Sequence, residues 1–198
     1  PQLSTMTVIF PGSFDPVHRG HIRLAAHVAS LPEVNEVWLL PSRRNPLKDH
    51  AVLAGDADRL AMLRLATEDV ASLHVSNIEL GLPYPSYSIT TLRELKCRFP
   101  DRDFRILIGS DNWPTFPHWR QAEAILRDFG LLIYPRPGYD IYGTLPEKVS
   151  LLDHSPLFPY SSTQVREKVA CGDDLTQILD PRVARYIADH KLYRNETD

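Results

Sequence analysis

Residues 8–21 have the sequence Val-Ile-Phe-Pro-Gly-Ser-Phe-Asp-Pro-Val-His-Arg-Gly-His, and this stretch decides the fold. Its first three residues, 8–10, are consecutive and apolar, which is typical of a strand buried on both faces of a parallel sheet. Gly12 then allows a sharp turn and a close approach of a ligand to the backbone. A helical pattern follows over residues 18–30. The stretch is therefore expected to form a strand–turn–helix unit of an α/β protein.

The same alternation of apolar strands and helices continues toward the end of the chain. Strands are expected at 37–40, 106–108 and 131–133, with weaker candidates at 73–80 and 148–152, and helices at 56–70, 89–99, 119–129 and 180–189. Ser88 is a candidate N-cap for the helix at 89–99. Asp180 followed by Pro181 is typical of an N-cap with proline at the first helical position.

This alternation predicts a Rossmann-like, doubly wound parallel sheet flanked by helices, with a small C-terminal helical segment. The ligand of such a sheet is expected beyond the carboxyl ends of the strands. Residues 6–198 are interpreted as a single domain, since the sequence shows no clean boundary. Residues 1–5, which precede Met6, are given no structural weight.

Composition narrows the class of protein. The chain has 198 residues, with 22 Lys and Arg against 25 Asp and Glu, and this slightly acidic balance argues against a general nucleic-acid binder. No apolar run approaches the roughly 18–20 residues that cross a bilayer, so no membrane span is expected. The two cysteines, Cys97 and Cys171, imply no disulfide framework, and the cytoplasm is the expected compartment.

His18 and His21 are three residues apart at the start of the first expected helix. At that spacing they share one face and can point at one anion. Helix N-termini already favour phosphate, and imidazoles add donors that are neutral or charged near pH 7. The pair therefore predicts a phosphate site. A zinc site competes with this interpretation but lacks a third ligand at a typical spacing; the other alternative is a surface turn with two histidines.

A second candidate phosphate site lies at Ser161-Ser162-Thr163-Gln164-Val165-Arg166. Ser161 with Gln164 three residues later fits a capping box, so a helix is expected to start here. Arg166 would lie in the first turn, where a cation opposes the helix dipole. That position favours a bound anion, with Ser162 and Thr163 as further donors. The alternative is a capped helix with a solvated arginine.

Both segments resemble motifs of the nucleotidyltransferase superfamily, whose members transfer a nucleotidyl group from a nucleoside triphosphate and release pyrophosphate. The first resembles the signature G-x-F-D-P-x-H-x-G-H, and the second resembles S-S-T-x-[IV]-R. His18 separates the chain from pantetheine-phosphate adenylyltransferases, which usually carry Thr there. The resemblance implies a catalytic or phosphate-binding role for His18, His21, Arg166, Gly12, Ser13, Phe14, Ser161, Ser162 and Thr163.

Further segments resemble the nicotinate mononucleotide adenylyltransferases in particular. Residues 108–112 resemble the G-A-D-N segment, 116–119 resemble F-x-x-W, and 85–92 resemble S-Y-T-x-D-T-L. The resemblance implies that Trp119 stacks on the pyridine ring, a contact worth about 1 kcal/mol beyond area burial. It also implies that Ser88, in place of the family's Thr, helps to hold the nicotinate carboxylate.

Two later matches extend the resemblance over residues 7–194. Residues 136–139 match R-P-G-Y, and residues 183–193 match the tail V-x-x-Y-I-x-x-H-x-L-Y. By resemblance, Gly109, Asp111 and Arg136 belong to the nucleotide side of the site.

The chain departs from the family in one loop that carries a candidate catalytic residue. The family's P-P-H-K is Asn-Pro-Leu-Lys here, so Lys48 is kept for the triphosphate while Leu47 replaces the histidine. Arg43 and Arg44, just before this loop, either compensate for the lost histidine or are solvated charges.

The reaction that the resemblance implies joins ATP and nicotinate mononucleotide to give deamido-NAD and pyrophosphate. The attacking phosphate is already ionised, so no general base is required, in keeping with the lack of a recognisable Ser-His-Asp triad. Mg²⁺ is expected to arrive on ATP, assisted by Asp111 or Asp15, without a metal site of the protein's own. Nicotinamide mononucleotide or pantetheine phosphate as acceptor, a non-catalytic nucleotide sensor, and a homo-oligomer are left open.

Overall fold

The computed structural model describes residues 5–44 and 53–194. Within these ranges the strands are β1 (Met6–Gly12), β2 (Val34–Pro41), β3 (Leu73–Val75), β4 (Asp103–Gly109), β5 (Leu131–Tyr134) and β6 (Val149–Leu151). The helices there are α1 (Arg19–Ala29), α2 (Asp56–Thr67), α3 (Ser88–Arg98), α4 (Ala122–Asp128), α5 (Ser162–Ala170) and α6 (Pro181–Asp189). Short 3₁₀ turns lie at η1 (Ile78–Gly81), η2 (Ser110–Asn112) and η3 (Phe116–His118).

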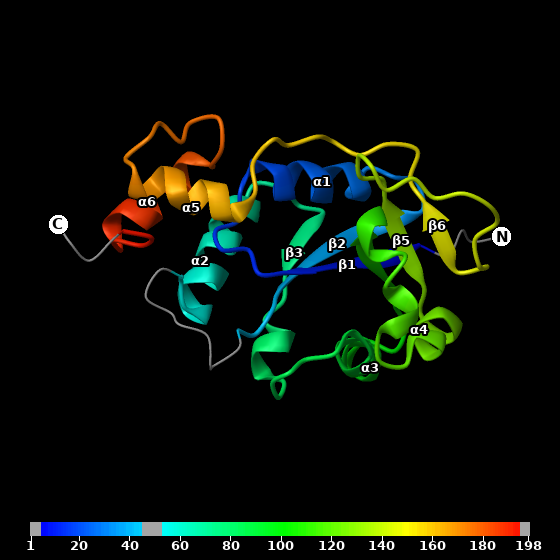
Figure 1. The fold of residues 1–198 in the computed structure, drawn as a ribbon. Coiled ribbons are helices and arrows are strands. Elements are labelled where there is room, and N and C mark those ends of the chain that lie inside the picture. Colours follow the sequence, from blue (N-terminus) through cyan, green and yellow to red (C-terminus); the bar gives the residue numbers. More distant parts are fainter. Residues whose placement is uncertain (1–4, 45–52, 195–198) are drawn as a thin grey trace.

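The strands form one parallel sheet in the order β3-β2-β1-β4-β5-β6. Figure 1 shows α1 on one side of this sheet and α3 on the other. One hydrophobic core joins the sheet to α1, α2, α5 and α6, and a second joins it to α3 and α4. The predicted doubly wound α/β fold, with helices on both faces, is confirmed.

The strand order reverses between β1 and β4, and this reversal positions the site. From β1 the chain winds outward through β2 to β3, then crosses to β4 and winds the other way. In such sheets the ligand crevice lies at the reversal, beyond the carboxyl ends of the strands. Those ends are Gly12 of β1 and Gly109 of β4. The turn of residues 13–18 therefore leaves the sheet where a ligand is expected.

Three local predictions are wrong in detail. The strand expected at 73–80 ends at Val75 and is followed by η1, because Ile78 and Glu79 are both buried and do not alternate as strand residues would. Ser88 is not the N-cap of α3; Tyr87 holds that position, and Ser88 is the first helical residue. The helix expected from 119 begins only at α4, because Gln121 has a left-handed φ of 52°.

The C-terminal helices pack beside α2, as the left part of Figure 1 shows. The hydroxyl of Tyr186 in α6 donates to Asp58 of α2 over 2.7 Å. Arg182 of α6 pairs with Glu68 and Asp69, just after α2. The predicted caps of both helices are confirmed: Ser161 caps α5 and Asp180 caps α6.

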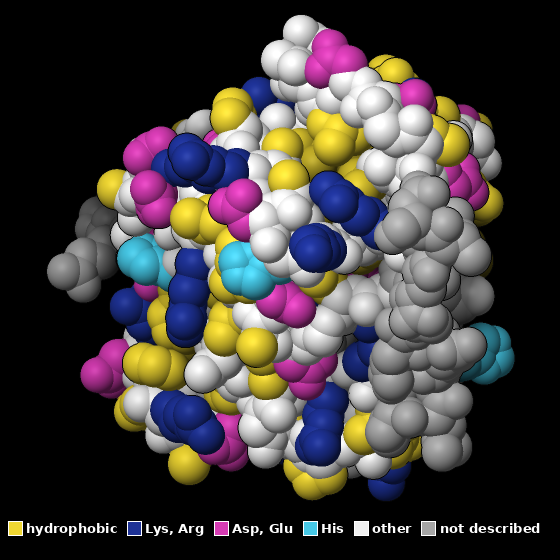
Figure 2. Space-filling view, turned by 90° about the vertical axis from the view of Figure 1, so that its left-hand side faces the viewer, with side chains coloured by type: hydrophobic (Ala, Val, Ile, Leu, Met, Phe, Trp, Pro, Cys, Tyr) yellow, Lys and Arg dark blue, Asp and Glu magenta, His cyan; other side chains and the backbone are white. Residues whose placement is uncertain are grey.

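The surface at this end of the molecule carries charges of both signs. Figure 2 shows basic and acidic side chains interspersed over its coloured part. A surface of one sign, as a nucleic-acid partner would require, is not formed on the described part of this face. None of the helices in the described ranges has both the length and the apolar character to cross a membrane.

Candidate active site

His18 and His21 form the start of α1. His18 is the N-cap, and the backbone N–H of His21 donates to its ring Nδ1 over 3.3 Å. In return, the backbone N–H of His18 donates to the ring Nδ1 of His21 over 3.1 Å. The two rings stack with centroids 3.6 Å apart. The expected arrangement, with both imidazoles on one face of the first turn, is confirmed.

These contacts determine the protonation of both rings. A ring nitrogen that accepts a hydrogen bond carries no proton, so each Nδ1 is bare and each Nε2 is the donor. Burial lowers the pKa of His18 to about 4. Burial, with the charge of His18 as a lesser cause, lowers the pKa of His21 well below its ordinary value. At neutral pH the pair therefore presents two uncharged N–H donors. Of the two forms that the sequence left open, neutral and charged imidazole, the neutral one is present.

Phe158 extends the stack to three rings. It lies on the other side of His18, with centroids 4.5 Å apart and the rings nearly parallel. A Cβ at Gly20 would lie 2.5 Å from the Phe158 ring, so only glycine leaves room for it. Gly20 thus has a steric role at the centre of the histidine motif. Sequence reasoning missed Phe158, whose stretch carries no helical or strand pattern.

A cavity of ≈ 770 Å³ opens beside the histidines. Five of the residues singled out from the sequence line it, namely His18, His21, Arg136, Ser161 and Ser162. Most of its other wall residues are apolar or aromatic, among them Phe10, Leu24, Tyr134, Pro135, Leu157 and Phe158. A wall of this kind suits a nucleoside, with donors at one end for phosphates.

The N-terminus of α5 meets the turn after β1. Ser162 donates to the carbonyl oxygen of Pro16 over 3.2 Å. Arg166 donates to the carbonyl oxygen of Asp15 over 2.7 Å and to the hydroxyl of Thr163 over 3.2 Å. The capping box with Ser161 is formed, but Arg166 is held against the turn, so the alternative of a solvated arginine is wrong.

A second cavity, of ≈ 370 Å³, lies on the other side of that turn. Its wall consists of Ser13, Asp15, Ser42, Arg43, Arg44, Leu53, Arg59, Tyr84 and Arg166. Four arginines and a single carboxylate are thus on the wall of one small cavity, a charge balance that favours an anionic ligand. Arg43 and Arg44 are both on this wall; Arg43 donates to the carbonyl oxygen of Leu82, and Arg44 pairs with Asp15. They are not merely solvated charges.

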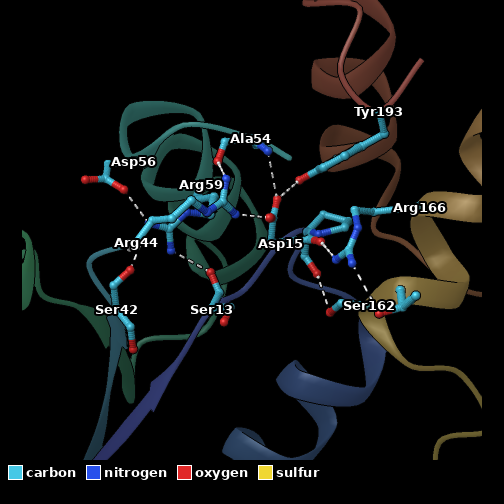
Figure 3. A network of polar contacts seen from close by, with 12 residues as sticks. Ser13, Asp15, Ser42, Arg44, Ala54, Asp56, Arg59, Ser162, Arg166 and Tyr193 are labelled. Atoms are coloured by element: carbon cyan, nitrogen blue, oxygen red, sulfur yellow. Dashed lines mark hydrogen bonds and ion pairs between the residues drawn. The ribbon is translucent and has the colours of Figure 1, made fainter. Parts of the chain in front are cut away.

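Arg59 of α2 holds the ends of β1 and β2 together. Its side chain is almost fully buried, and its guanidinium donates to the carbonyl oxygens of Ser13 and Ser42 over 2.7 and 2.8 Å. It also pairs with Asp56, one turn before it (Figure 3). The sequence did not predict this role. It shows that Asp56 and Arg59 are three residues apart, but not that Ser13 and Ser42 lie next to Arg59 in the fold.

The two candidate carboxylates for magnesium differ. Both oxygens of Asp15 are engaged: Oδ1 by Tyr193 and Ala54, and Oδ2 by Arg44. Asp15 therefore does not fit a metal ligand, which corrects one of the two expected positions. Asp111 carries a buried Oδ1 without a hydrogen-bond partner among the described residues, so it does fit one. No group of three metal-binding side chains is found in residues 5–44 and 53–194.

Gly109 has no side chain, and the space above it is occupied by Asp111 and Arg136, the two other residues expected on the nucleotide side. A Cβ there would lie 2.9 Å from Cδ of Arg136. The Arg136 side chain crosses above the glycine and reaches Asp111 over 3.4 Å, while its backbone N–H donates to Ser110. Of the three expected residues, only Arg136 is part of a cavity wall.

The Phe14 side chain is not available to a ligand. It is buried, and its ring packs edge-on against Phe10 and His21 at 5.3 and 5.0 Å. The left-handed φ of 47° turns it under Gly12. The expected phosphate contact of Phe14 is therefore limited to its backbone.

The two segments expected to bind nicotinate lie side by side. The Arg120 guanidinium lies 4.6 Å from the ring centroid of Tyr87, which joins the segment of Trp119 to that of Ser88. Trp119 packs on Phe116 at 5.2 Å and is half-buried. Neither Trp119 nor Ser88 belongs to the walls of the two cavities. Their contact with nicotinate stays a prediction.

The remaining expected residues are Thr163 and Lys48. Thr163 lies at the start of α5 but on neither cavity wall. Lys48, with Leu47 beside it, lies outside the described residues. Substrate contacts of all the site residues remain predictions.

The family model described as cytidylyltransferase-like matches residues 9–168, which include most of β1, all of β2 to β6, the histidine motif and most of α5. Among solved structures, the chain is similar to Plasmodium falciparum nicotinic acid mononucleotide adenylyltransferase complexed with NaAD, with a TM-score of 0.77. The match covers 96% of this chain and 97% of that one at 19% identity. The same protein complexed with APC gives a TM-score of 0.76 at 20% identity. At such identities the likeness shows the fold alone, a parallel sheet flanked by helices, while the family model places the chain among the cytidylyltransferase-like proteins.

Sequence relatives narrow the class. A protein of Bacteroides thetaiotaomicron with the name "Probable nicotinate-nucleotide adenylyltransferase" is 44% identical over 185 residues, covering 93% of this chain and 91% of the relative. The protein of the same name from Bacteroides fragilis is 42% identical over 184 residues, covering 92% and 91%. The chain belongs to the nicotinate-nucleotide adenylyltransferase family.

Proposed function

We propose that the chain transfers the adenylyl group of ATP to nicotinate mononucleotide, giving nicotinate adenine dinucleotide and pyrophosphate, as a step of NAD biosynthesis. One observation carries the proposal beyond family membership. The two uncharged imidazole donors of His18 and His21 stand at the reversal of the sheet and line a nucleoside-sized cavity, while Ser13 and Asp15 of the turn before them line an arginine-rich one. This arrangement suits the transfer of an adenylyl group from ATP to the phosphate of a second nucleotide.

The larger cavity is assigned to ATP. Its apolar walls, which include Leu157 and Phe158, accommodate the adenosine, while Arg136 and the serines at the start of α5 face the phosphates. Positive groups and free N–H groups at a helix N-terminus favour phosphate. The nucleoside and its triphosphate therefore run from this cavity toward the turn after β1.

The arginine-lined cavity is assigned to the phosphate of the acceptor and to the departing pyrophosphate. An oxygen of the acceptor phosphate attacks the α-phosphorus of ATP, and the bond from that phosphorus to the oxygen bridging it to the β-phosphorus breaks. The new bond joins the two nucleotides, and the bond electrons leave with pyrophosphate. Because the attacking oxygen is already ionised, catalysis rests on positioning and on stabilising charge.

His18 and His21 are assigned to the charge on the α-phosphate and the departing pyrophosphate. Their Nε2–H groups are fixed by the contacts at Nδ1, so the donors need no rearrangement during the reaction. The guanidinium of Arg166, which contacts the same turn from α5, is assigned to stabilise the same negative charge on the phosphates. Lys48 takes the role of a triphosphate ligand by its resemblance to the family motif.

Magnesium is assigned to the substrate, carried by the ATP phosphates. Of the two expected carboxylates, only Asp111 has an oxygen without a partner among the described residues; that oxygen is buried and Asp111 is on neither cavity wall, so its contact with the ion stays a prediction. The ion would supply neutralisation of phosphate charge. Trp119 and Ser88 are assigned to the nicotinate ring and its carboxylate. The expected compartment is the cytoplasm, in keeping with the free thiols of Cys97 and Cys171.

The test is pyrophosphate release with ATP and Mg²⁺, comparing nicotinate mononucleotide, nicotinamide mononucleotide and pantetheine phosphate side by side. We expect a strong preference for the nicotinate form, and product identified by mass as nicotinate adenine dinucleotide. Release with only another acceptor would keep the phosphate assignments and overturn the acceptor. ATP binding without release for any acceptor would replace the enzyme with a nucleotide sensor.

A further inference from the structure

The turn between β1 and α1 is fastened by residues that are far away in the sequence (Figure 3). Arg166 and Ser162 of α5 donate to the carbonyl oxygens of Asp15 and Pro16. A further contact comes from Tyr193, which follows α6 and donates to the Asp15 side chain over 2.5 Å. The C-terminal part of the chain therefore contacts the turn at which the phosphate chemistry is assigned.

The Asp15 carboxylate is buried and fully used. Only 2% of the residue is exposed. Its Oδ1 accepts from the Tyr193 hydroxyl and from the backbone N–H of Ala54 at 3.1 Å, and its Oδ2 pairs with Arg44. A buried charge is tolerated only when its hydrogen bonds are made, so each of these donors is needed.

The tail reaches this position through an unusual backbone. Lys191 and Tyr193 have φ values of 54° and 60°, in the left-handed region that residues other than glycine rarely adopt. Such a conformation costs on the order of 1 kcal/mol or more for each residue. Burial of the Tyr193 ring, which is only 4% exposed, and its bond to Asp15 offset that cost.

The Tyr193 hydroxyl is a permanent donor. Burial raises its pKa far above the ordinary value, and the negative charge of Asp15 adds to the effect. At neutral pH the hydroxyl therefore keeps its proton and donates it to the Asp15 side chain.

Asp15 in turn faces two cations of the arginine-lined cavity. Arg44 pairs with its carboxylate, and Arg166 donates to its backbone carbonyl over 2.7 Å. Both guanidiniums are on the cavity wall. A shift of Asp15 would move both cations, since each is bonded to it directly.

We propose that Tyr193 is a positioning residue of the transferase site: by fixing Asp15, it holds Arg44 and Arg166 in place on the wall of the phosphate cavity. This inference rests on the proposed function for its kinetic consequences. It assigns a functional role to the segment after α6, which lies outside both motifs that are assigned to phosphate. Tyr193 touches no reacting atom and acts through Asp15.

The chain offers a matched control in Tyr186. Its hydroxyl also donates to an aspartate, Asp58, over 2.7 Å, and it also ties the C-terminal segment to the rest of the fold. Neither Tyr186 nor Asp58 belongs to either cavity wall. Replacing each tyrosine by phenylalanine removes a hydroxyl–aspartate bond and keeps the ring. Because Asp15 is buried and Asp58 is only partly buried, Tyr193→Phe should lower the melting temperature more, whereas a purely structural effect should leave KM unchanged in both variants.

The experiment compares Tyr193→Phe and Tyr186→Phe in the full chain. Three quantities are measured: the melting temperature, the KM and kcat of pyrophosphate release, and the dissociation constant of a non-hydrolysable ATP analogue by calorimetry. We expect both variants to melt lower. We expect only Tyr193→Phe to raise the KM values and the dissociation constant by about tenfold, because a hydrogen bond to a charged group is worth a factor of this order. Tyr186→Phe should stay within twofold.

A second comparison tests the route through Arg44. In an Arg44→Ala background, Tyr193→Phe should raise KM by clearly less than tenfold, because only Arg166 is left to be positioned through Asp15. Lower melting temperatures with unchanged KM and unchanged analogue binding in both variants would overturn the proposal. If the unmodified protein released no pyrophosphate with any acceptor while Tyr193→Phe still weakened analogue binding, the proposed function would fail and the positioning role would stand.

Discussion

His18 and His21 cap each other, with the backbone N–H of each donating to the ring Nδ1 of the other over 3.1 and 3.3 Å. A helix start leaves several N–H groups without partners, and this reciprocal contact satisfies two of them. It also leaves both Nε2–H groups directed away from the helix start. The same two residues thus begin α1 and supply the donors assigned to phosphate.

This arrangement predicts the titration of the two rings. In nitrogen-edited NMR spectra of labelled protein, His18 and His21 should remain neutral with the proton on Nε2 between pH 8 and pH 5.5, because burial lowers the pKa of both. An unperturbed imidazole changes charge near 6.5. Spectra of His18→Asn and His21→Asn assign the signals. A charge step near pH 6.5, or a proton on Nδ1 of either ring, would contradict the arrangement.

The pKa of His18 also predicts how stability depends on pH. Below 6.5 the unfolded chain takes up a proton at this position, whereas the folded protein does so only near 4. The contribution is therefore fully present above pH 6.5 and is lost as the pH falls toward 4. At 1.36 kcal/mol for each pKa unit, it amounts to about 3 kcal/mol.

Urea unfolding of the protein and of His18→Asn measures this contribution. Asparagine still caps a helix but does not titrate. The difference between the two free energies of unfolding should change by about 3 kcal/mol from pH 7 to pH 4, at the expense of the unmodified protein. Parallel curves over that interval would show that His18 does not carry the effect.

Removal of one imidazole donor should affect chemistry more than folding. We expect His21→Asn to lower kcat by about 10²–10³, the usual effect of losing a fixed donor to transition-state charge. Its circular dichroism should match that of the unmodified protein. The exposed His118 provides the control, since His118→Asn should keep kcat within twofold. An unchanged kcat in His21→Asn would remove the assigned role of the pair.

Local patterns in the sequence predicted the elements and several of their ends. Consecutive apolar residues at 8–10 and 131–133 lie in β1 and β5, and the capping box at Ser161 starts α5 as expected. These predictions succeeded because the deciding contacts lie within one element. Serine is a residue type that favours the N-cap, so the sequence predicted Ser88 there. The prediction was wrong because the helix begins one residue earlier, and Tyr87 is the N-cap.

Contacts between distant parts of the chain could not be predicted in the same way. Phe158 stacks on His18, and Tyr193 bonds to Asp15, yet neither aromatic residue lies in a pattern that names its partner. Arg59 looked like an ordinary helix cation, and only the fold places the carbonyl ends of two strands beside it. The sequence thus located the two motifs that are assigned to phosphate, but not the residues that hold them in place.

The Phe158 contact predicts a steric rescue. Gly20→Ala should lower the melting temperature and kcat, because the added Cβ would lie 2.5 Å from the Phe158 ring and displace it from His18. Phe158→Gly in the same chain removes the clash, because it takes away both the ring and the Cβ of Phe158, and that Cβ would lie 2.7 Å from the added carbon. The double variant should therefore be more stable than Gly20→Ala alone, a non-additive result that a thermal denaturation cycle measures. Strictly additive shifts would show that the two residues do not compete for this space.

The acceptor assignment predicts a selective effect at Trp119. Trp119 and Trp113 both pack on Phe116, at 5.2 and 5.8 Å, so replacing either by alanine removes comparable contact with the same ring. We expect Trp119→Ala to raise the KM for nicotinate mononucleotide about fivefold or more, since aromatic stacking of about 1 kcal/mol corresponds to that factor. The KM for ATP should change less, and Trp113→Ala should leave both within twofold. Steady-state kinetics with each substrate varied in turn decides the matter: a larger rise for ATP than for the mononucleotide, or equal rises in the two variants, would reassign Trp119 to the adenine side or to packing alone.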